Sequence, residues 1–257
     1  MESGIKETPM MSQYMKFKKQ YPDKVVLFRM GDFFETFGED AKITSKVLNI
    51  TLTSRDKNIN PTPLAGFPHK ALEQYLPKLI NAGYCTVIVD QLEDPKLAKG
   101  IVKRGVTRIV TPGTLDGDNA NEIKNNYLAA FYTDKKSLFV SLCDVSTGEF
   151  LYISTEYVNK NIDAILSSYE PVEVLILENE KDLKFPTLPV QFVSKSIRNK
   201  DYAVEKIKEF FDIKSIESLG LDEQNSSLFS VAMILEYILE TQLMDPRHIQ
   251  KPKKVNL

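Results

Sequence analysis

The sequence predicts an α/β protein of two domains. Short runs rich in β-branched and aromatic residues, such as 84–90 and 172–177, alternate with segments whose apolar residues recur at helical spacing, such as 70–82 and 158–169. The chain has 257 residues, 42% of them hydrophobic, which is enough for two cores of ordinary domain size. The polar, acidic stretch 116–122 interrupts the pattern and predicts the domain boundary.

Composition excludes several classes of protein. No apolar run is long enough to span a bilayer, and the first residues lack the apolar core of a secretory signal, so we expect a cytoplasmic protein with no membrane partner. Cys85 and Cys143 lie far apart in strand-like segments and predict buried thiols. With only two histidines and no Cys/His cluster, the sequence predicts no metal site.

The charge is unevenly distributed. Residues 1–118 hold 17 basic and 14 acidic side chains, whereas the remainder holds 16 and 21. A polyanion would therefore meet the first half more readily than the second.

The first half begins with a helix over 9–20, with Pro9 in its first turn, followed by an apolar strand over 25–28. The later elements are a helix ending near 49, a strand over 50–53, a polar loop over 54–63, a helix over 70–82, and strands over 84–90 and 106–110.

The stretch 30–37 joins the first strand to the next helix. We expect Gly31 to form the strand-to-helix turn and Asp32 to cap the helix, which places Phe33 in the first helical turn, pointing outward. An exposed aromatic followed by Glu35 suits a wedge between stacked bases. The alternative is that Phe33 fills a core and Glu35 completes a capping box with Asp32.

The second half opens with three strands. The expected elements are strands over 127–133, 137–145 and 149–154, a helix over 158–169, strands over 172–177 and 190–193, and helices over 202–211 and 226–243. The turn Ser146-Thr147-Gly148 predicts a hairpin between the second and third strands.

Five segments in fixed order carry a specific resemblance. They are Thr8-Pro9-Met10-Met11-Ser12-Gln13-Tyr14, Arg29-Met30-Gly31-Asp32-Phe33-Phe34-Glu35, Pro63-Leu64-Ala65-Gly66-Phe67-Pro68, Asp90-Gln91-Leu92-Glu93-Asp94-Pro95 and Arg108-Ile109-Val110-Thr111-Pro112-Gly113-Thr114. Together they resemble the mismatch-binding domain of the MutS family of DNA mismatch-repair proteins.

The resemblance implies the fold and the division of the chain. It implies a mixed-sheet mismatch-recognition domain over 1–118, a linker over 119–124, a ribonuclease-H-like connector domain over 125–222, and the start of a helical lever over 223–257. The ATPase part of the family has no counterpart here, because no phosphate-binding loop motif occurs. ATP and magnesium are therefore expected only for that missing part, and no cofactor is expected in this chain.

The resemblance also implies partners and site residues. The partner would be double-stranded DNA with mismatches or small loops, and Phe33 and Glu35 would enter the minor groove at the mispair. Where the family usually has Tyr after the wedge, this chain has Phe34. Arg55 and Lys70 fall at positions that suit contacts with the DNA backbone. The connector would also touch a MutL-like protein, so a protein-interaction module with weak DNA binding is the alternative function.

An enzyme is the rival class. A ribonuclease-H-like fold invites a search for clustered carboxylates that bind metal, and Asp144 sits on an early strand with Glu149 across the hairpin. However, Asp144 precedes a tight turn, where Asp is simply a good turn former. We therefore expect no catalysis within these residues. The basic set Lys96, Lys99, Lys103, Arg104 and Arg108 is expected mostly to be a solvated face, with Arg108 satisfying a local acid.

Overall fold

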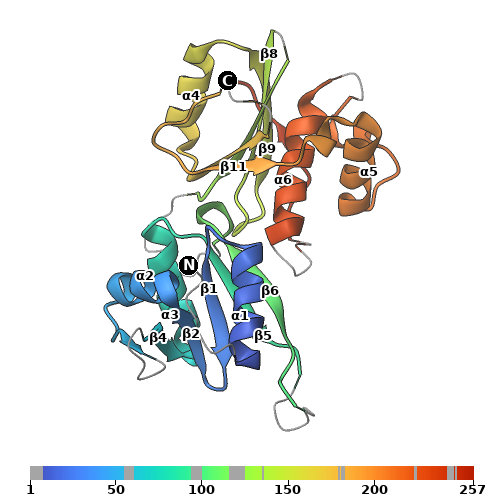
Figure 1. Cartoon of the computed structure of the whole chain (residues 1–257). Helices are drawn as coiled ribbons and strands as arrows, with labels where there is room; N and C mark the ends of the chain where they lie inside the picture. The colour runs from blue at the N-terminus through green and yellow to red at the C-terminus, as the bar shows by residue number, and fades with distance from the viewer. Residues whose placement is uncertain are drawn as a thin grey trace. The chain divides into compact units, whose positions relative to one another are not determined.

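The computed structural model describes residues 8–54, 61–93, 100–115, 125–134, 136–178, 180, 183–222, 225–241, 246 and 248–257. The chain divides into two compact units, Met1–Thr111 and Pro112–Leu257 (Figure 1). Each unit contains a six-stranded mixed sheet with helices packed on it. The predicted α/β class is thereby confirmed.

The first unit is built on a sheet of order β3-β4-β2-β1-β5-β6, in which only β1 and β5 run parallel. Its elements are α1 (Pro9–Gln20), β1 (Val25–Met30), β2 (Phe33–Phe37), α2 (Gly38–Leu48), β3 (Thr53–Ser54), β4 (Pro63–Pro68), the 3₁₀ turn η1 (His69–Ala71), α3 (Leu72–Asn81), β5 (Thr86–Gln91) and β6 (Arg104–Val110).

The prediction for the stretch 31–37 was wrong. A hairpin replaces the expected helix start: β1 and β2 pair antiparallel around the two-residue turn Gly31-Asp32, and α2 begins only at Gly38. Gly31 has φ +56° and Asp32 has no positive φ, the pattern of a type II′ hairpin turn. Asp32 therefore caps no helix, and the capping box with Glu35 does not exist.

A buried carboxylate holds helices α1 and α2 to β1. Asp40 of α2 is 2% exposed and accepts hydrogen bonds from Tyr14 Oη at 3.0 Å, Lys18 Nζ at 2.8 Å and the Val26 backbone N–H at 3.0 Å. Burial, together with the neighbouring charge of Asp40, raises the pKa of Tyr14. The buried charge is paired and hydrogen-bonded, as such groups must be to remain stable.

The second unit has the sheet order β11-β10-β7-β8-β9-β12. Its elements are the turn η2 (Pro112–Thr114), β7 (Leu128–Thr133), β8 (Ser137–Cys143), β9 (Phe150–Glu156), α4 (Asn159–Tyr169), β10 (Glu173–Leu177), β11 (Val190–Val193), η3 (Lys195–Arg198), α5 (Lys200–Phe211), η4 (Ile216–Leu219), α6 (Ser227–Thr241) and β12 (Lys253–Lys254). The predicted hairpin is present, because β8 and β9 pair antiparallel from Ser137 to Cys143.

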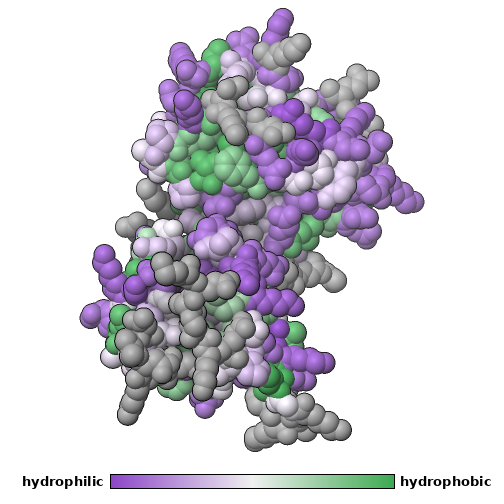
Figure 2. All heavy atoms as spheres, in the orientation of Figure 1, coloured by the Kyte–Doolittle hydropathy of each residue, from purple (hydrophilic) through white to green (hydrophobic). Residues whose placement is uncertain are grey.

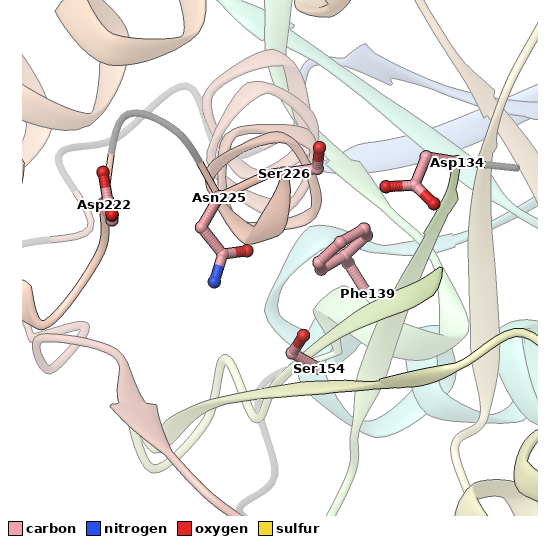
Figure 3. Close-up of a pocket in the computed structure, with 6 residues that line it drawn as sticks. All are labelled: Asp134, Phe139, Ser154, Asp222, Asn225 and Ser226. Carbon is pink, nitrogen blue, oxygen red and sulfur yellow. The ribbon is translucent and has the colours of Figure 1, made fainter. Parts of the chain in front are cut away.

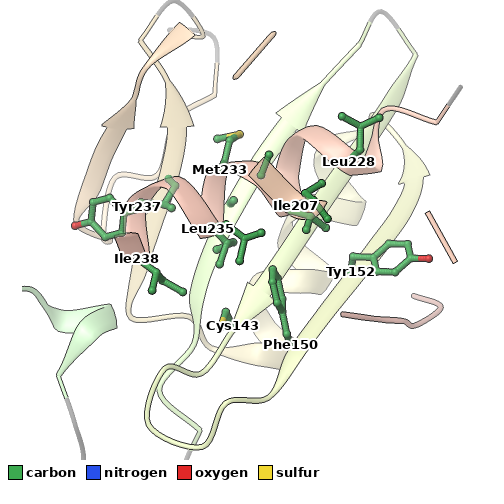
Figure 4. Close-up of a cluster of buried hydrophobic side chains, with 14 of the residues drawn as sticks. Cys143, Phe150, Tyr152, Ile207, Leu228, Met233, Leu235, Tyr237 and Ile238 are labelled. Carbon is green, nitrogen blue, oxygen red and sulfur yellow. The ribbon is translucent and has the colours of Figure 1, made fainter. Parts of the chain in front are cut away.

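Helix α6 lies in the core of the second unit. It packs on β7 and β8 and against α5, and its side chains, including Leu228, Met233 and Leu235, join one buried cluster with Cys143 and Phe150 (Figure 4). After α6 the chain returns to the sheet, where β12 pairs with β9. The structure therefore differs from the expected helical lever over 223–257: a helix with this many apolar residues is stable because the second sheet covers it.

The turn η2 explains where the units divide. Glu173 at the start of β10 is fully buried, and it accepts hydrogen bonds from the Gly113 backbone N–H at 2.9 Å and from Tyr237 Oη of α6 at 3.0 Å. A Cβ on Gly113 would lie 2.8 Å from the same carboxylate. The turn is thus held in the second unit, so the units divide at Thr111 and Pro112, ahead of the polar stretch in which we expected the boundary.

Candidate nucleic-acid interface

The tip of the β1–β2 hairpin carries an exposed aromatic ring. Phe33 is the first residue of β2, paired with Met30 across the turn, and it is 46% exposed. Burying a Phe side chain is worth about 1.5–3 kcal/mol, so a ring left in water at a hairpin tip is available to a partner. The outward orientation expected for Phe33 is found, although on a strand and not on a helix.

Strand geometry places Glu35 on the same face as Phe33. Side chains alternate along β2, so Phe33, Glu35 and Phe37 face one way, and Phe34 and Thr36 face the other, where both are buried. On the first face exposure falls from Phe33 through the half-buried Glu35 to Phe37, which packs with Tyr14 of α1. The helix covers the base of the hairpin and leaves its tip in solvent.

Strand β4 supports the tip from the other side. Phe33 pairs with Pro68, Glu35 with Gly66, and Phe37 with Leu64, so these three β4 residues share the face of Phe33. The residue after Pro68 closes the turn, because the His69 backbone N–H donates to Asp32 O at 2.8 Å. The hairpin is therefore a rigid element held on both edges, which is the support a precise contact needs.

Arg104 of β6 secures β1 close to the tip of the hairpin. Its guanidinium donates to Arg29 O at 2.7 Å and to Gln13 Oε1 of α1 at 3.1 Å, and it lies 5.0 Å above the Phe28 ring. We expected this side chain on a solvated face. Local sequence pattern could not reveal the contacts with Arg29 and Gln13, because these residues lie about 75 or more positions earlier in the chain, in β1 and α1.

The remaining predicted cations have different positions. Lys70 is exposed in η1 and lies two residues after Pro68, the residue of β4 that pairs with Phe33. Arg108 lies 3.7 Å from Glu73 and so satisfies an acid, as expected. Arg55, Lys96 and Lys99 lie outside the described residues. The structure thus brings Phe33, Glu35 and Lys70 to one end of the first unit.

In the second unit Asp144 serves a turn. One carboxylate oxygen accepts from the Ser146 and Thr147 backbone N–H groups at 2.9 and 3.3 Å and the other from the Asn126 N–H at 3.0 Å. Glu149 accepts from Tyr127 Oη, and burial, together with this bond, raises the pKa of Tyr127. Among the described residues no three His, Cys, Asp or Glu side chains are arranged to hold a metal ion.

The second unit also contains a polar cavity of about 320 Å³ (Figure 3). Its polar groups include Asp134, which accepts from the Lys136 and Ser137 N–H groups, and Asn225, whose Oδ1 accepts from the Ser227 N–H. Both side chains stabilise a turn or a helix start, so the cavity offers no free ligand set from these residues.

The visible surface is mostly hydrophilic, with a hydrophobic area on the second unit in the region of β11 (Figure 2). Phe192 of β11, a strand at the end of the sheet order, is 59% exposed. Among the described helices none is both long and apolar enough to cross a bilayer.

The fold defines a protein of two mixed α/β units, and comparison with known proteins identifies both. The family described as MutS domain I matches residues 8–119, and the family described as MutS domain II matches residues 126–250. The chain belongs to the MutS family.

Relatives agree with this assignment. The DNA mismatch repair protein MutS of Flavobacterium psychrophilum is 45% identical over 251 residues, covering 95% of this chain and 29% of that protein. The protein of the same name from Flavobacterium johnsoniae is 43% identical, covering 99% and 30%. That of Methanosarcina acetivorans is 41% identical, covering 94% and 29%. The chain therefore spans somewhat under a third of the relatives it matches.

Proposed function

We propose that this chain binds double-stranded DNA at mismatches or small loops, with Phe33 entering the minor groove beside the mispair and Glu35 contacting a displaced base. The observation that carries the proposal is the hairpin tip: an aromatic ring that is 46% exposed, with a carboxylate on the same strand face two residues on. The relatives' names, which concern DNA mismatch repair, support it.

The wedge selects for deformability. Inserting a ring beside a base unstacks a step at a cost of about a few kcal/mol and kinks the duplex. A mispair is already poorly stacked and bends more easily, so the same insertion costs less there. Phe33 therefore discriminates without reading sequence, through the difference in deformation energy between paired and mispaired DNA.

Glu35 restricts binding to sites that offer it a partner. A carboxylate close to phosphates is repelled, so Glu35 disfavours an undistorted duplex. At a mispair a displaced base edge can hydrogen-bond to the carboxylate and offset the repulsion. Attraction to the DNA backbone comes from cations, for which the exposed Lys70 is the described candidate. Arg55, which lies outside the described residues, is a second candidate from the sequence.

The experiment is a fluorescence titration of the 257-residue chain with a mismatched duplex and its fully paired counterpart at low salt. We expect tighter binding of the mismatched duplex and a loss of that preference in Phe33→Ala. A minor-groove binder normally uses several contact regions, so low ionic strength is needed to measure a single one. Equal affinity of the unmodified chain for both duplexes would refute the proposal.

A further inference from the structure

Glu35 has two unequal neighbours across the sheet. On the β1 side it pairs with Phe28, which is fully buried and covered by the Arg104 guanidinium 5.0 Å from the ring. On the β4 side it pairs with Gly66, which has no side chain. The neighbouring position is thus filled on the β1 side, whereas on the β4 side no side chain competes with Glu35 for space.

The space over Gly66 is taken by Glu35 itself. A Cβ added to Gly66 would lie 3.2 Å from Cγ of Glu35 and 3.5 Å from its Cα. It would also lie 2.9 Å from Phe34 O. Real Cβ contacts are rarely so close, so a residue with a side chain at this position would displace the Glu35 side chain, the β2 backbone, or both.

Backbone conformation gives no reason for this glycine. The described glycines with positive φ include Gly31 and Gly38 but not Gly66. The neighbouring β4 residues on the same face, Leu64 and Pro68, both carry side chains. The gap at Gly66 is therefore local, and it coincides with the residue opposite the proposed base contact.

We propose that Gly66 is a positioning residue for Glu35, and through it a determinant of the preference for mispaired DNA. The inference rests on the function proposed above. By leaving room for the Glu35 side chain to lean toward β4, Gly66 keeps the carboxylate on the face of Phe33. A side chain at position 66 moves the carboxylate away from the base edge and weakens discrimination.

A double-mutant cycle separates this route from general damage to the sheet. The proteins are the unmodified chain, Gly66→Ala, Glu35→Ala and the double variant, and the readout is the ratio of dissociation constants for paired and mismatched duplexes. Glu35→Ala removes Cγ, so the clash with the side chain disappears while the contact with Phe34 O remains. Any effect that persists in the double variant belongs to the backbone.

We expect Gly66→Ala to lower the discrimination ratio by about tenfold, the scale of one hydrogen bond to a charged group. In the Glu35→Ala background it should cause no further loss. Gly105→Ala is the matched control, because its Cβ would meet the flexible, exposed side chain of Leu92, directly after β5. This variant should leave the discrimination ratio unchanged.

Each alternative outcome is distinct. Undiminished discrimination in Gly66→Ala, with a loss in Glu35→Ala, overturns the role of Gly66 and leaves the proposed function standing. Equal losses from Gly66→Ala in both backgrounds assign its effect to β2 as a whole and also overturn it. An unmodified chain without mismatch preference refutes the proposed function, and the role of Gly66 with it.

A second variant covers the case in which Gly66→Ala does not fold. Glu35→Asp keeps the charge but shortens the side chain by one methylene, so the carboxylate lies over Gly66 and does not reach past it. We expect this variant to lose discrimination while its urea unfolding curve stays unchanged. Full discrimination in Glu35→Asp would show that reach across Gly66 is irrelevant.

Discussion

The Asp32 carbonyl and His69 close the hairpin that carries Phe33. The His69 backbone N–H donates to this oxygen at 2.8 Å, and His69 Nδ1 lies 3.1 Å from it. The turn is therefore fixed to β4 as well as to β1. A substitution of an outward side chain at the tip should change binding and leave this framework intact.

Phe33→Ala should change binding without changing stability. The ring is 46% exposed, so we expect the free energy of unfolding to fall by no more than about 1 kcal/mol, as for most surface substitutions. The preference for mismatched DNA should disappear, with weak non-specific binding remaining. Urea unfolding and fluorescence titration measure the two effects.

Phe34→Ala is the matched control one residue along. Phe34 is 2% exposed and packs 6.2 Å from Phe67, so truncation should cost about 3–5 kcal/mol. If Phe33→Ala proved as destabilising as Phe34→Ala, the wedge would have to be abandoned.

Glu35→Gln should tighten binding to fully paired DNA. Removing the charge relieves repulsion from phosphates, and the amide also offers base edges a donor, so affinity for the paired duplex rises and discrimination falls. The effect of the charge should shrink as salt is raised from 50 to 200 mM because screening increases. Titrations at both salt concentrations test this, and discrimination that stays constant would remove Glu35 from the interface.

Tyr14→Phe should reduce the loss of folding stability that occurs at alkaline pH. The pKa of Tyr14 is raised in the folded protein by burial and Asp40, so the unfolded chain loses its proton first, near the ordinary value of 10.0. The contribution of Tyr14 to the free energy of unfolding is therefore complete below pH 10, and above pH 10 it decreases by about 1.4 kcal/mol per pH unit. The variant lacks this contribution.

The comparison of the two proteins isolates Tyr14, because the other tyrosines titrate in both. At pH 7 Tyr14→Phe should be about 1–3 kcal/mol less stable, since it loses the hydrogen bond to Asp40. Urea unfolding from pH 7 to 11 gives both quantities. Parallel stability curves above pH 10 would contradict the prediction.

The second unit should fold as residues 112–257 but not as 125–222. The shorter fragment lacks α6, whose buried residues fill the space against β7 and β8, and also lacks Gly113, a partner of the buried Glu173. Exposing that surface should leave a partly folded, aggregation-prone chain. Circular dichroism and cooperative urea unfolding distinguish the two, and a cooperative transition in 125–222 would show that α6 is dispensable.

Much of the fold could be predicted from the sequence where local pattern and packing agree. Helix α1 begins at Pro9 as expected, with Thr8 as its cap, and α4 ends at Tyr169. Helix α6 was expected at nearly its observed bounds, but its place in the core was not, because its partners on β7 and β8 lie about 90 residues earlier. Helical periodicity shows which face is apolar and not what covers it.

The hairpin at Gly31 was missed for a different reason. Phe34 and Phe37 fit a helical spacing of three, and Asp32 is a favourable helix cap, so two local signals agreed on the wrong structure. The aromatic and β-branched content of Phe33 to Phe37 was the contrary signal, and pairing with β4 on the other edge decides the outcome. The same pairing creates the Gly66 gap, which no reading of β2 alone could find.

Because β2 is paired on both edges, the hairpin tolerates changes in the chemistry of its side chains far better than changes in their number. A single residue inserted between Phe34 and Glu35 would shift the strand by one position against β1 and β4. The side chains on one side of the insertion would then change faces, which would turn the Phe34 ring outward or place the Glu35 carboxylate in the core. Residues at positions 33 and 35 can therefore vary in identity during evolution only while the strand between the turn and α2 keeps its length.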